Sequence, residues 1–147
     1  MIYDIVLVGF TYIFMNIAEW AIHRASHYKE SGSLYLWHKL HHIDYPVTRL
    51  ESDVYIDSSS TKDNIFLRYI ILVLVVVWSV STLRTFLVVF IEVSLYSLLV
   101  DYFHKQLHLK DSTFKNYRLF QYYKRNHFNH HIKQNTNYGF FPIQNLI

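Results

Sequence analysis

Apolar residues are gathered into three long runs, and the chain between them is mixed or polar. The first run covers residues 1–22, "MIYDIVLVGFTYIFMNIAEWAI", and is interrupted by Asn16 and Glu19. No basic stretch precedes this run and no small-residue cleavage site follows it, so it differs from a cleavable signal peptide. It predicts a membrane helix whose C-terminal half turns a polar stripe towards the protein interior.

The other two runs predict one helical hairpin. Residues 64–80 and 86–100 are apolar, and residues 81–85, "STLRT", form the turn between them. Each arm is near the short end of the roughly 20 residues that a spanning helix needs, so the hairpin either crosses the bilayer or dips deep into it. The β-branched run Val75–Val77 also suits a strand, but two isolated strands would leave unsatisfied edges in lipid. Glu92, in the second arm, should face protein or pair with a basic group.

The remaining segments are polar or mixed in character. Residues 28–64 include "TRLESDVYIDSSSTKDN" (48–64), which predicts a loop or cap. Residues 114–126, "FKNYRLFQYYKRN", interleave aromatic and basic side chains, which fits either a helix at the headgroup level or one packed on its neighbours. No linker divides the chain, so residues 1–147 are predicted to form a single domain.

Composition narrows the fold class to an all-α, integral membrane helical bundle. Of 147 residues 52% are hydrophobic, whereas Gly and Pro together number only five, too few for the turns of a sandwich or barrel. The absence of cysteine excludes disulfides and thiolate metal sites, and a net charge of +3 gives little indication of nucleic-acid binding. Of fourteen Lys and Arg, Arg84 alone falls at the far turn of the hairpin and the other thirteen lie in or beside the histidine-bearing segments. By the positive-inside rule the histidine side is cytosolic.

The ten histidines repeat one pattern twice, HxxxH followed by HxxHH. The four groups are "HRASH" with His23 and His27, "HKLHH" with His38, His41 and His42, "HKQLH" with His104 and His108, and "HFNHH" with His127, His130 and His131. Residues three or four apart share one face of a helix, so each group presents its imidazoles together. Buried imidazoles without partners are costly, and this pattern therefore predicts a shared metal site.

The number of histidines bears on which metal is bound. Imidazole suits zinc, copper, iron and nickel, but a structural zinc takes four ligands and a catalytic zinc three plus water. Ten ligands split over two ions average five each, near an octahedral shell with one open position, which suits two irons that activate dioxygen between them. Haem would use only one or two histidines. Glu19, one turn before His23, and Asp101, three residues before His104, are predicted to accept a ring N–H and orient a ligand.

These four groups, the hairpin between the second and third, and "NYGF" at 137–140 resemble the fatty acid hydroxylase superfamily. Its members are membrane di-metal oxygenases and include fatty acid hydroxylases, sterol desaturases, sterol methyl oxidases and carotenoid hydroxylases. The resemblance runs from about Trp20 to Phe140. It implies that the ten histidines hold two iron ions on the cytosolic side, with zinc a possible replacement in purified protein.

The resemblance also implies a reaction. A membrane lipid, either a fatty acyl chain or a sterol, would be hydroxylated or desaturated with dioxygen and two electrons. A cytochrome b-type partner or another reductase would supply the electrons, in the endoplasmic reticulum or a bacterial inner membrane.

Two features depart from the family pattern. Only 22 residues precede His23, where members usually carry further membrane helices, and no Trp-Asp pair follows Asn-Tyr-Gly. Both features suggest a minimal or truncated member. The alternative function is a non-catalytic metal-binding membrane protein derived from this family. A metal transporter fits less well, because the histidines gather near one surface and do not line a path across the bilayer.

Overall fold

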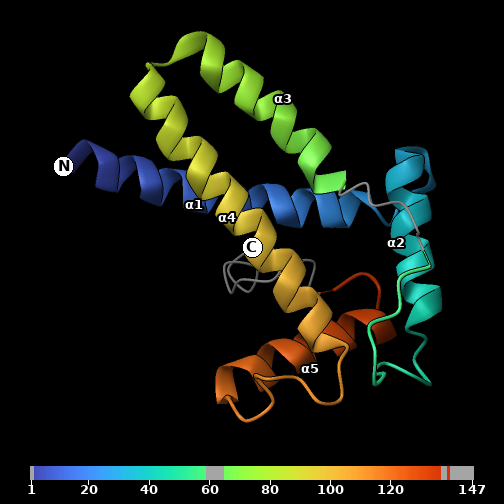
Figure 1. The fold of residues 1–147 in the computed structure, drawn as a ribbon. Helices are drawn as coiled ribbons and strands as arrows, with labels where there is room; N and C mark the ends of the chain where they lie inside the picture. The colour runs from blue at the N-terminus through green and yellow to red at the C-terminus, as the bar shows by residue number, and fades with distance from the viewer. Residues whose placement is uncertain (1, 59–64, 137–138, 140–147) are drawn as a thin grey trace.

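The computed structural model describes residues 2–58, 65–136 and 139, and within these ranges the secondary structure is helical (Figure 1). The helices are α1 (Ile2–Ala25), α2 (Ser33–Asp44), α3 (Ile65–Val80), α4 (Leu83–Leu107) and α5 (Arg118–Ile132), with a short 3-10 turn η1 (Lys29–Ser31) before α2. Extended pairing in the described ranges is limited to an isolated bridge between Ser52 and Leu109. The predicted all-α fold class is confirmed.

In the described ranges, two helices are long and apolar enough to cross a membrane. α1 has 24 residues and α4 has 25, which at 1.5 Å per residue gives about 36 Å or slightly more, against a hydrocarbon core of about 30 Å. α3 has 16 residues, about 24 Å. α1 and α4 extend beyond the predicted apolar runs and carry His23 and His104 inside continuous helix, because residues 23–25 and 101–107 contain neither proline nor glycine.

The apolar helices α1, α3 and α4 pack on one another around a small core. Met15, Ile70, Val89 and Val93 are buried together and bring one side chain or more from each helix. The β-branched run Val75–Val77 lies within α3 and is helical, because a helix satisfies its own backbone hydrogen bonds in an apolar setting.

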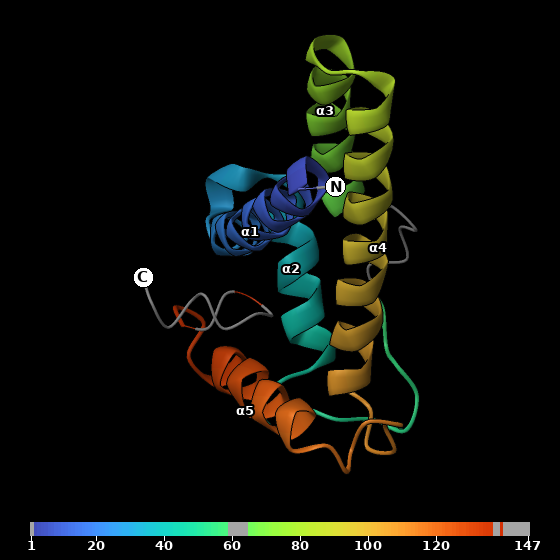
Figure 2. The ribbon, with the colours of Figure 1, turned by 90° about the vertical axis from the view of Figure 1, so that its left-hand side faces the viewer.

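A tight turn joins α3 to α4. Thr82 caps α4 by accepting a hydrogen bond from the Thr85 N–H at 3.3 Å. Near the same turn, the Arg84 guanidinium donates to the Asp4 carboxylate at 2.9 Å. α1 and α4 therefore begin near each other at the hairpin turn. They then cross, so that α1 leads into α2 and α4 runs down to α5 (Figures 1 and 2).

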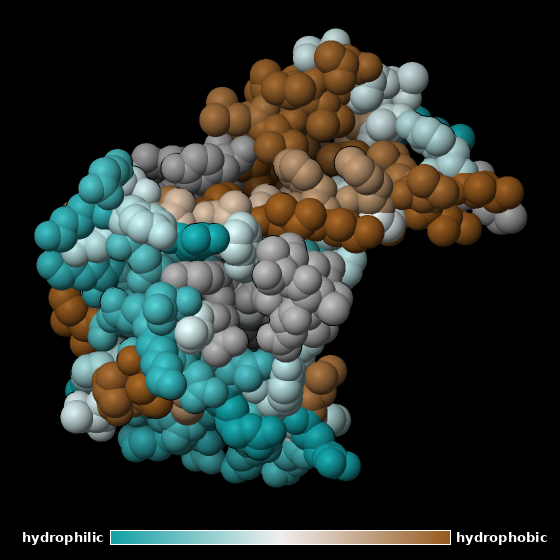
Figure 3. All heavy atoms as spheres, turned by 180° about the vertical axis from the view of Figure 1, so that it is seen from behind, coloured by the Kyte–Doolittle hydropathy of each residue, from teal (hydrophilic) through white to brown (hydrophobic). Residues whose placement is uncertain are grey.

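The polar helices α2 and α5 lie on the side of α1 away from the hairpin turn, where α4 finishes (Figure 2). Figure 3 shows the same division on the surface, with hydrophobic residues gathered over the hairpin and the adjoining part of α1, and hydrophilic residues over the other end. This is the distribution expected when one end of a bundle sits in lipid and the other in water.

Three further sequence-based expectations can be compared with the structure, and one of them needs adjustment. The helix expected over 114–126 begins only at Arg118, and residues 114–117 form a turn before it. The expected loop over 48–64 is irregular as far as residue 58, and residues 59–64 lie outside the described ranges. Glu92 was expected to face protein or pair with a basic group; its Oε2 is buried, in agreement with the first alternative, and has no hydrogen-bond partner among the described residues.

Candidate metal centre

All four histidine groups lie at the C-terminal ends of helices. His23 is in the last turn of α1, His41 and His42 in the last turn of α2, and His130 and His131 in the last turn of α5. His104 is in the last turn of α4, whose C-cap is His108. The C-terminal end of a helix carries partial negative charge from its unpaired carbonyls and stabilises cations. Convergence of four such ends favours a bound cation electrostatically.

The first histidine group consists of His23, His27, His38 and His130, each offering one ring nitrogen within 4.8 Å of the others. The Nε2 atom of His130 is 3.1 Å from that of His23 and 3.3 Å from that of His27. The Nε2 atoms of His38 and His27 are 2.8 Å apart. His42 stands beside this group, with its Nε2 2.9 Å from that of His38.

The second histidine group consists of His41, His108, His127 and His131, gathered within the same limit of 4.8 Å. The Nε2 atom of His127 is 2.8 Å from that of His108 and 3.1 Å from that of His131. The Nε2 atoms of His41 and His131 are 3.2 Å apart. His104 stands beside this group, with its Nε2 3.2 Å from that of His41.

The histidines are shared between the two groups according to their helical spacing. Pairs four residues apart stay with one group, namely His23 with His27, His38 with His42, His104 with His108, and His127 with His131. The odd histidine of each HxxHH motif crosses to the other group, His41 to the second and His130 to the first. The two groups adjoin, since the ring centroids of His42 and His131 are 4.3 Å apart. The structure thus brings together all ten histidines predicted as ligands, and their ligand role remains a prediction.

Backbone carbonyls fix the tautomer of three of these imidazoles. A carbonyl oxygen can only accept a hydrogen bond, so a ring Nδ1 facing one must carry the proton and leaves the Nε2 lone pair available. The Nδ1 atom of His108 donates to the carbonyl of Leu50 at 2.8 Å, that of His131 to Tyr45 at 2.9 Å, and that of His130 to Thr136 at 2.7 Å. Such outer hydrogen bonds orient metal-binding imidazoles in proteins.

Burial keeps the imidazoles neutral. Desolvation, reinforced by the neighbouring His130, lowers the pKa of His27 to about 4. Desolvation also lowers the pKa of His131 to about 3, although its hydrogen bond to the Tyr45 carbonyl acts in the opposite direction. For His38, His41 and His127, burial and the surrounding histidines hold the pKa well below 6.5. At pH 7 these rings are therefore neutral, the state that metal binding requires.

Tyr45 supports the second group and was missed by sequence reasoning. It is fully buried, and its ring stacks on His108 with centroids 3.8 Å apart. Its hydroxyl accepts a hydrogen bond from the Ile56 N–H at 2.6 Å, and its carbonyl accepts one from the His131 Nδ1–H. No local sequence pattern indicates this role, because Tyr45 contacts His108 and His131, which are distant in sequence.

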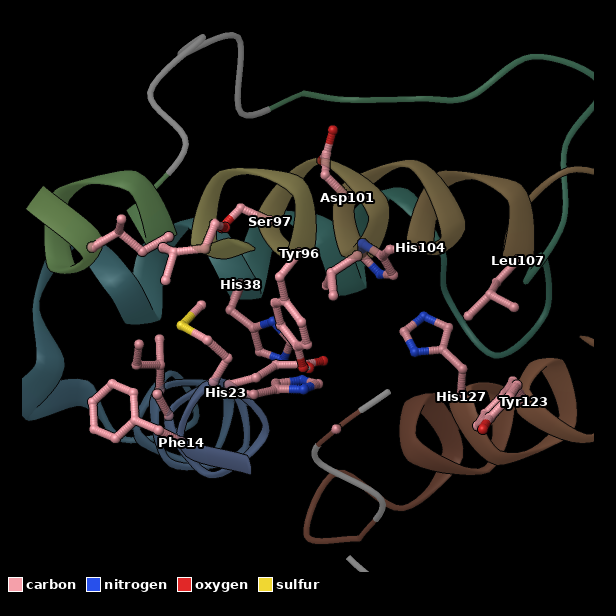
Figure 4. Close-up of a pocket in the computed structure, with 18 of the residues that line it drawn as sticks. Phe14, His23, His38, Tyr96, Ser97, Asp101, His104, Leu107, Tyr123 and His127 are labelled. Carbon is pink, nitrogen blue, oxygen red and sulfur yellow. The ribbon is translucent and has the colours of Figure 1, made fainter. Parts of the chain in front are cut away.

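The two predicted orienting carboxylates have other partners. The Tyr96 hydroxyl donates to Glu19 Oε2 at 2.6 Å, and Glu19 is buried, with 8% of its surface exposed. Asp101 forms an ion pair with Lys105 at 2.6 Å, one helical turn later. Figure 4 shows the Asp101 carboxylate directed away from the His104 ring. The role of both carboxylates in orienting ligands remains a prediction.

An apolar cavity of about 200 Å³ adjoins the histidines. Its walls include Phe14 and Ala18 from α1, Val73 from α3 and Val93 from α4. Four histidines also line it (Figure 4): His23 and His38 from the first group, His127 from the second, and His104 beside the second. A hydrophobic chain lying in this cavity would reach the face of the metal centre.

An all-helical bundle with two helices fit to cross a membrane and ten converging histidines defines a class, the histidine-cluster membrane proteins. The model of the fatty acid hydroxylase family matches residues 8–145, and the chain belongs to this family. The resemblance inferred from the sequence is therefore confirmed. Searches of curated proteins and of solved structures found no match.

Membership carries coarse functional information. The family generally comprises hydroxylases and desaturases, which are membrane oxidoreductases, and histidine groups of this kind can bind metal. Of the predicted Asn-Tyr-Gly-Phe continuation, Gly139 lines the cavity, and residues 137, 138 and 140 lie outside the described ranges.

Proposed function

We propose that this protein is a membrane di-iron oxygenase that hydroxylates or desaturates a lipid, either a fatty acyl chain or a sterol. The observation that carries the proposal is the meeting of two adjoining histidine groups with one apolar cavity. A metal centre for a soluble substrate would not need such a cavity between apolar helices. A lipid tail is the substrate that matches its lining.

The spacing of the ring nitrogens supports ions of high coordination number. With metal–nitrogen bonds of about 2.1 Å, neighbouring ligands lie about 3.0 Å apart in an octahedron and about 3.4 Å apart in a tetrahedron. The Nε2 separations within and beside the two groups run from 2.8 to 3.3 Å. Five neutral nitrogen donors for each of two ions favour iron over a structural zinc, although zinc would also bind imidazole.

In this proposal His23, His27, His38, His42 and His130 hold one iron, and His41, His104, His108, His127 and His131 hold the other. The bound irons would supply the reductive activation of dioxygen. Hydroxylation consumes O₂, two electrons and two protons, and leaves one oxygen atom on the lipid and one in water. Desaturation uses the same inputs and releases both oxygen atoms as water. A cytochrome b-type protein or another reductase supplies the electrons.

The chain's own contribution is to position the lipid and to exclude water. The apolar walls hold the lipid tail so that one C–H bond faces the histidines, and correct placement of this kind contributes strongly to rate. The same walls keep bulk water from the reacting carbon. The Glu19–Tyr96 pair and Ser97 are among the polar positions of a mostly apolar lining and would set how far the tail enters.

A matched pair of substitutions tests the cavity. Ala18 lines it, whereas Ala21, on the same helix, is exposed. We expect Ala18→Phe to lower turnover roughly 100-fold, because a ring placed there displaces the lipid tail, while iron content stays unchanged. Ala21→Phe should alter neither quantity. Equal turnover in the two variants would show that the substrate lies elsewhere.

The decisive experiment is purification without oxygen from a host that lacks its own lipid hydroxylase. We expect two irons per chain, oxygen consumption that depends on an added reductant, and a new hydroxylated or desaturated lipid in the membrane extract. A non-catalytic metal-binding member of the family would bind metal and consume no oxygen. That result, with every donor system supplied, would reject the enzymatic function.

A further inference from the structure

Lys124 is a buried cation in α5, next to the metal centre. Only 6% of its surface is exposed. Its Nζ atom lies 6.0 Å from the ring centroid of Phe120 and 5.6 Å from that of Phe128. The ammonium group forms an ion pair with Glu51 and donates to the Leu109 carbonyl at 2.9 Å. A buried ammonium group is costly to desolvate, so it persists only with partners in good geometry.

The other lysine ion pairs of the described ranges are much more exposed. The lysine side chains that pair with Asp101, Asp53 and Asp111 are 41 to 53% exposed, against 7% for Lys124. Exposed pairs of this kind contribute little to stability. Lys124 therefore differs from them, because its ion pair is buried and joins two segments of the chain.

The segments that Lys124 joins both lead to His108. Glu51 follows Leu50, whose carbonyl accepts the Nδ1 proton of His108 at 2.8 Å. Leu109 follows His108 directly. Two backbone hydrogen bonds hold these segments together, from the Ser52 N–H to the His108 carbonyl at 2.9 Å and from the Lys110 N–H to the Ser52 carbonyl at 3.1 Å.

We propose that Lys124, through Glu51 and the Leu109 carbonyl, is a positioning residue for the second histidine group. It holds the Leu50 carbonyl against His108 and so keeps the His108 Nε2 lone pair directed into that group. The inference rests on the proposed two-ion centre and adds that its two halves are supported by different parts of the chain.

The first histidine group does not use this connection. Its His130 donates the Nδ1 proton to the Thr136 carbonyl, beyond the end of α5. The second group takes both of its carbonyl acceptors, Tyr45 and Leu50, from the segment between α2 and α3. Loss of Lys124 should therefore loosen one ion and leave the other in place.

The test is the rate at which iron leaves the full-length protein in lipid nanodiscs when a chelator is added. Removing a group that supports a ligand typically weakens metal binding 10- to 100-fold. We expect Lys124→Met to speed release of one of the two irons by about that factor and to leave the second rate unchanged. Lys115→Met, which removes an exposed ion pair with Asp111, is the matched control and should match the unaltered protein.

Two histidine variants show which of the two irons is released faster. In His41→Ala, which retains the first group, adding Lys124→Met should not change the release rate. In His130→Ala, which retains the second group, the same addition should speed it. Glu51→Gln keeps the side-chain shape, removes the charge at a partly exposed position, and carries the test if Lys124→Met fails to fold.

The outcomes separate the two proposals. Equal acceleration of both irons, or wild-type rates in Lys124→Met and Glu51→Gln, would overturn the positioning role while leaving the two-ion centre intact. An unaltered protein that binds no iron would instead overturn the proposed function itself.

Discussion

At the scale of single residues, the proposed metal centre depends on imidazoles that are both neutral and oriented. Burial prevents protonation, and backbone carbonyls fix which nitrogen is available. These two effects act on individual side chains, so point substitutions should report on them directly.

The first prediction concerns one ligand from each group. His130→Ala and His41→Ala should each leave about one iron per chain and abolish turnover, because the site loses a donor that no neighbouring residue replaces. Metal analysis of protein purified without oxygen measures this. Asn129→Ala, on the exposed face of the same helix as His130, is the control and should retain both irons. Full occupancy in both histidine variants would contradict the ligand assignment.

The second prediction concerns pH. The pKa of His27 is lowered to about 4 and that of His131 to about 3 in the folded protein, against about 6.5 in an unfolded chain. Below pH 6.5 the unfolded chain therefore binds protons that the folded chain does not, and the free energy of unfolding falls as pH decreases. The slope is at most about 1.4 kcal/mol per pH unit for the buried His131 and smaller for His27, which is partly exposed to solvent.

Thermal unfolding of metal-free protein in detergent checks this second prediction. The melting temperature should be steady above pH 7 and should fall steeply between pH 6.5 and pH 5. A melting temperature that does not change over this interval would show that the histidines are solvated in the folded state.

At the scale of elements, α4 combines two tasks in one helix. Its apolar part packs against α1 and α3, and its last turn delivers His104, with His108 as the cap. No proline or glycine separates these parts, so the packing of the helix fixes the position of the ligands. Stability of the helix packing and order of the metal centre should therefore change together.

Two leucines of α4 give the third prediction. Leu107 is 1% exposed, whereas Leu98 is 67% exposed on the outer face. Leu107→Ala should lower the free energy of unfolding by about 2–5 kcal/mol, because it leaves a cavity where α4 meets the histidines. Leu98→Ala should cost less than about 1 kcal/mol. Denaturant titration in detergent compares the two, and similar losses would show that the buried end of α4 is not part of a tight core.

At the scale of the whole molecule, the structure has an apolar end and a histidine end. The Asp4–Arg84 ion pair marks the former and the ten histidines the latter. By the positive-inside rule, the distribution of basic residues predicts that the histidine end faces the cytosol.

Topology gives the fourth prediction, and the absence of cysteine makes it simple to measure. Leu83→Cys places a thiol at the hairpin turn, and Asn116→Cys places one between α4 and α5. A membrane-impermeant maleimide should label the Asn116→Cys variant from the cytosolic side and the Leu83→Cys variant from the opposite side. Labelling of both from one side would mean that the hairpin enters the bilayer and returns without crossing it.

Much of this molecule was predictable because it depends on local spacing. The hydrophobic runs predicted three apolar helices, and the HxxxH and HxxHH motifs predicted imidazoles grouped on helix faces, since residues four apart lie on one side of a helix. Boundaries were less certain, as with α5, which begins at Arg118 after a turn. The partner of Glu19 is Tyr96, which is distant in sequence and therefore not indicated by any local pattern. The partner of Asp101 is Lys105, one helical turn later, and this pair was overlooked although its spacing is local.

The sequence by itself determined the number of histidines, their helical pairing and the membrane character of the chain, all of which follow from residue type and short-range periodicity. Only the tertiary structure decided which histidines share a group. It places His41 in the second group and His130 in the first, each apart from the other histidines of its own HxxHH motif. It also supplied the Tyr45 and Leu50 carbonyls and the Lys124–Glu51 pair. These depend on how α2, α4 and α5 cross, and that arrangement is set by packing between segments that no local pattern encodes.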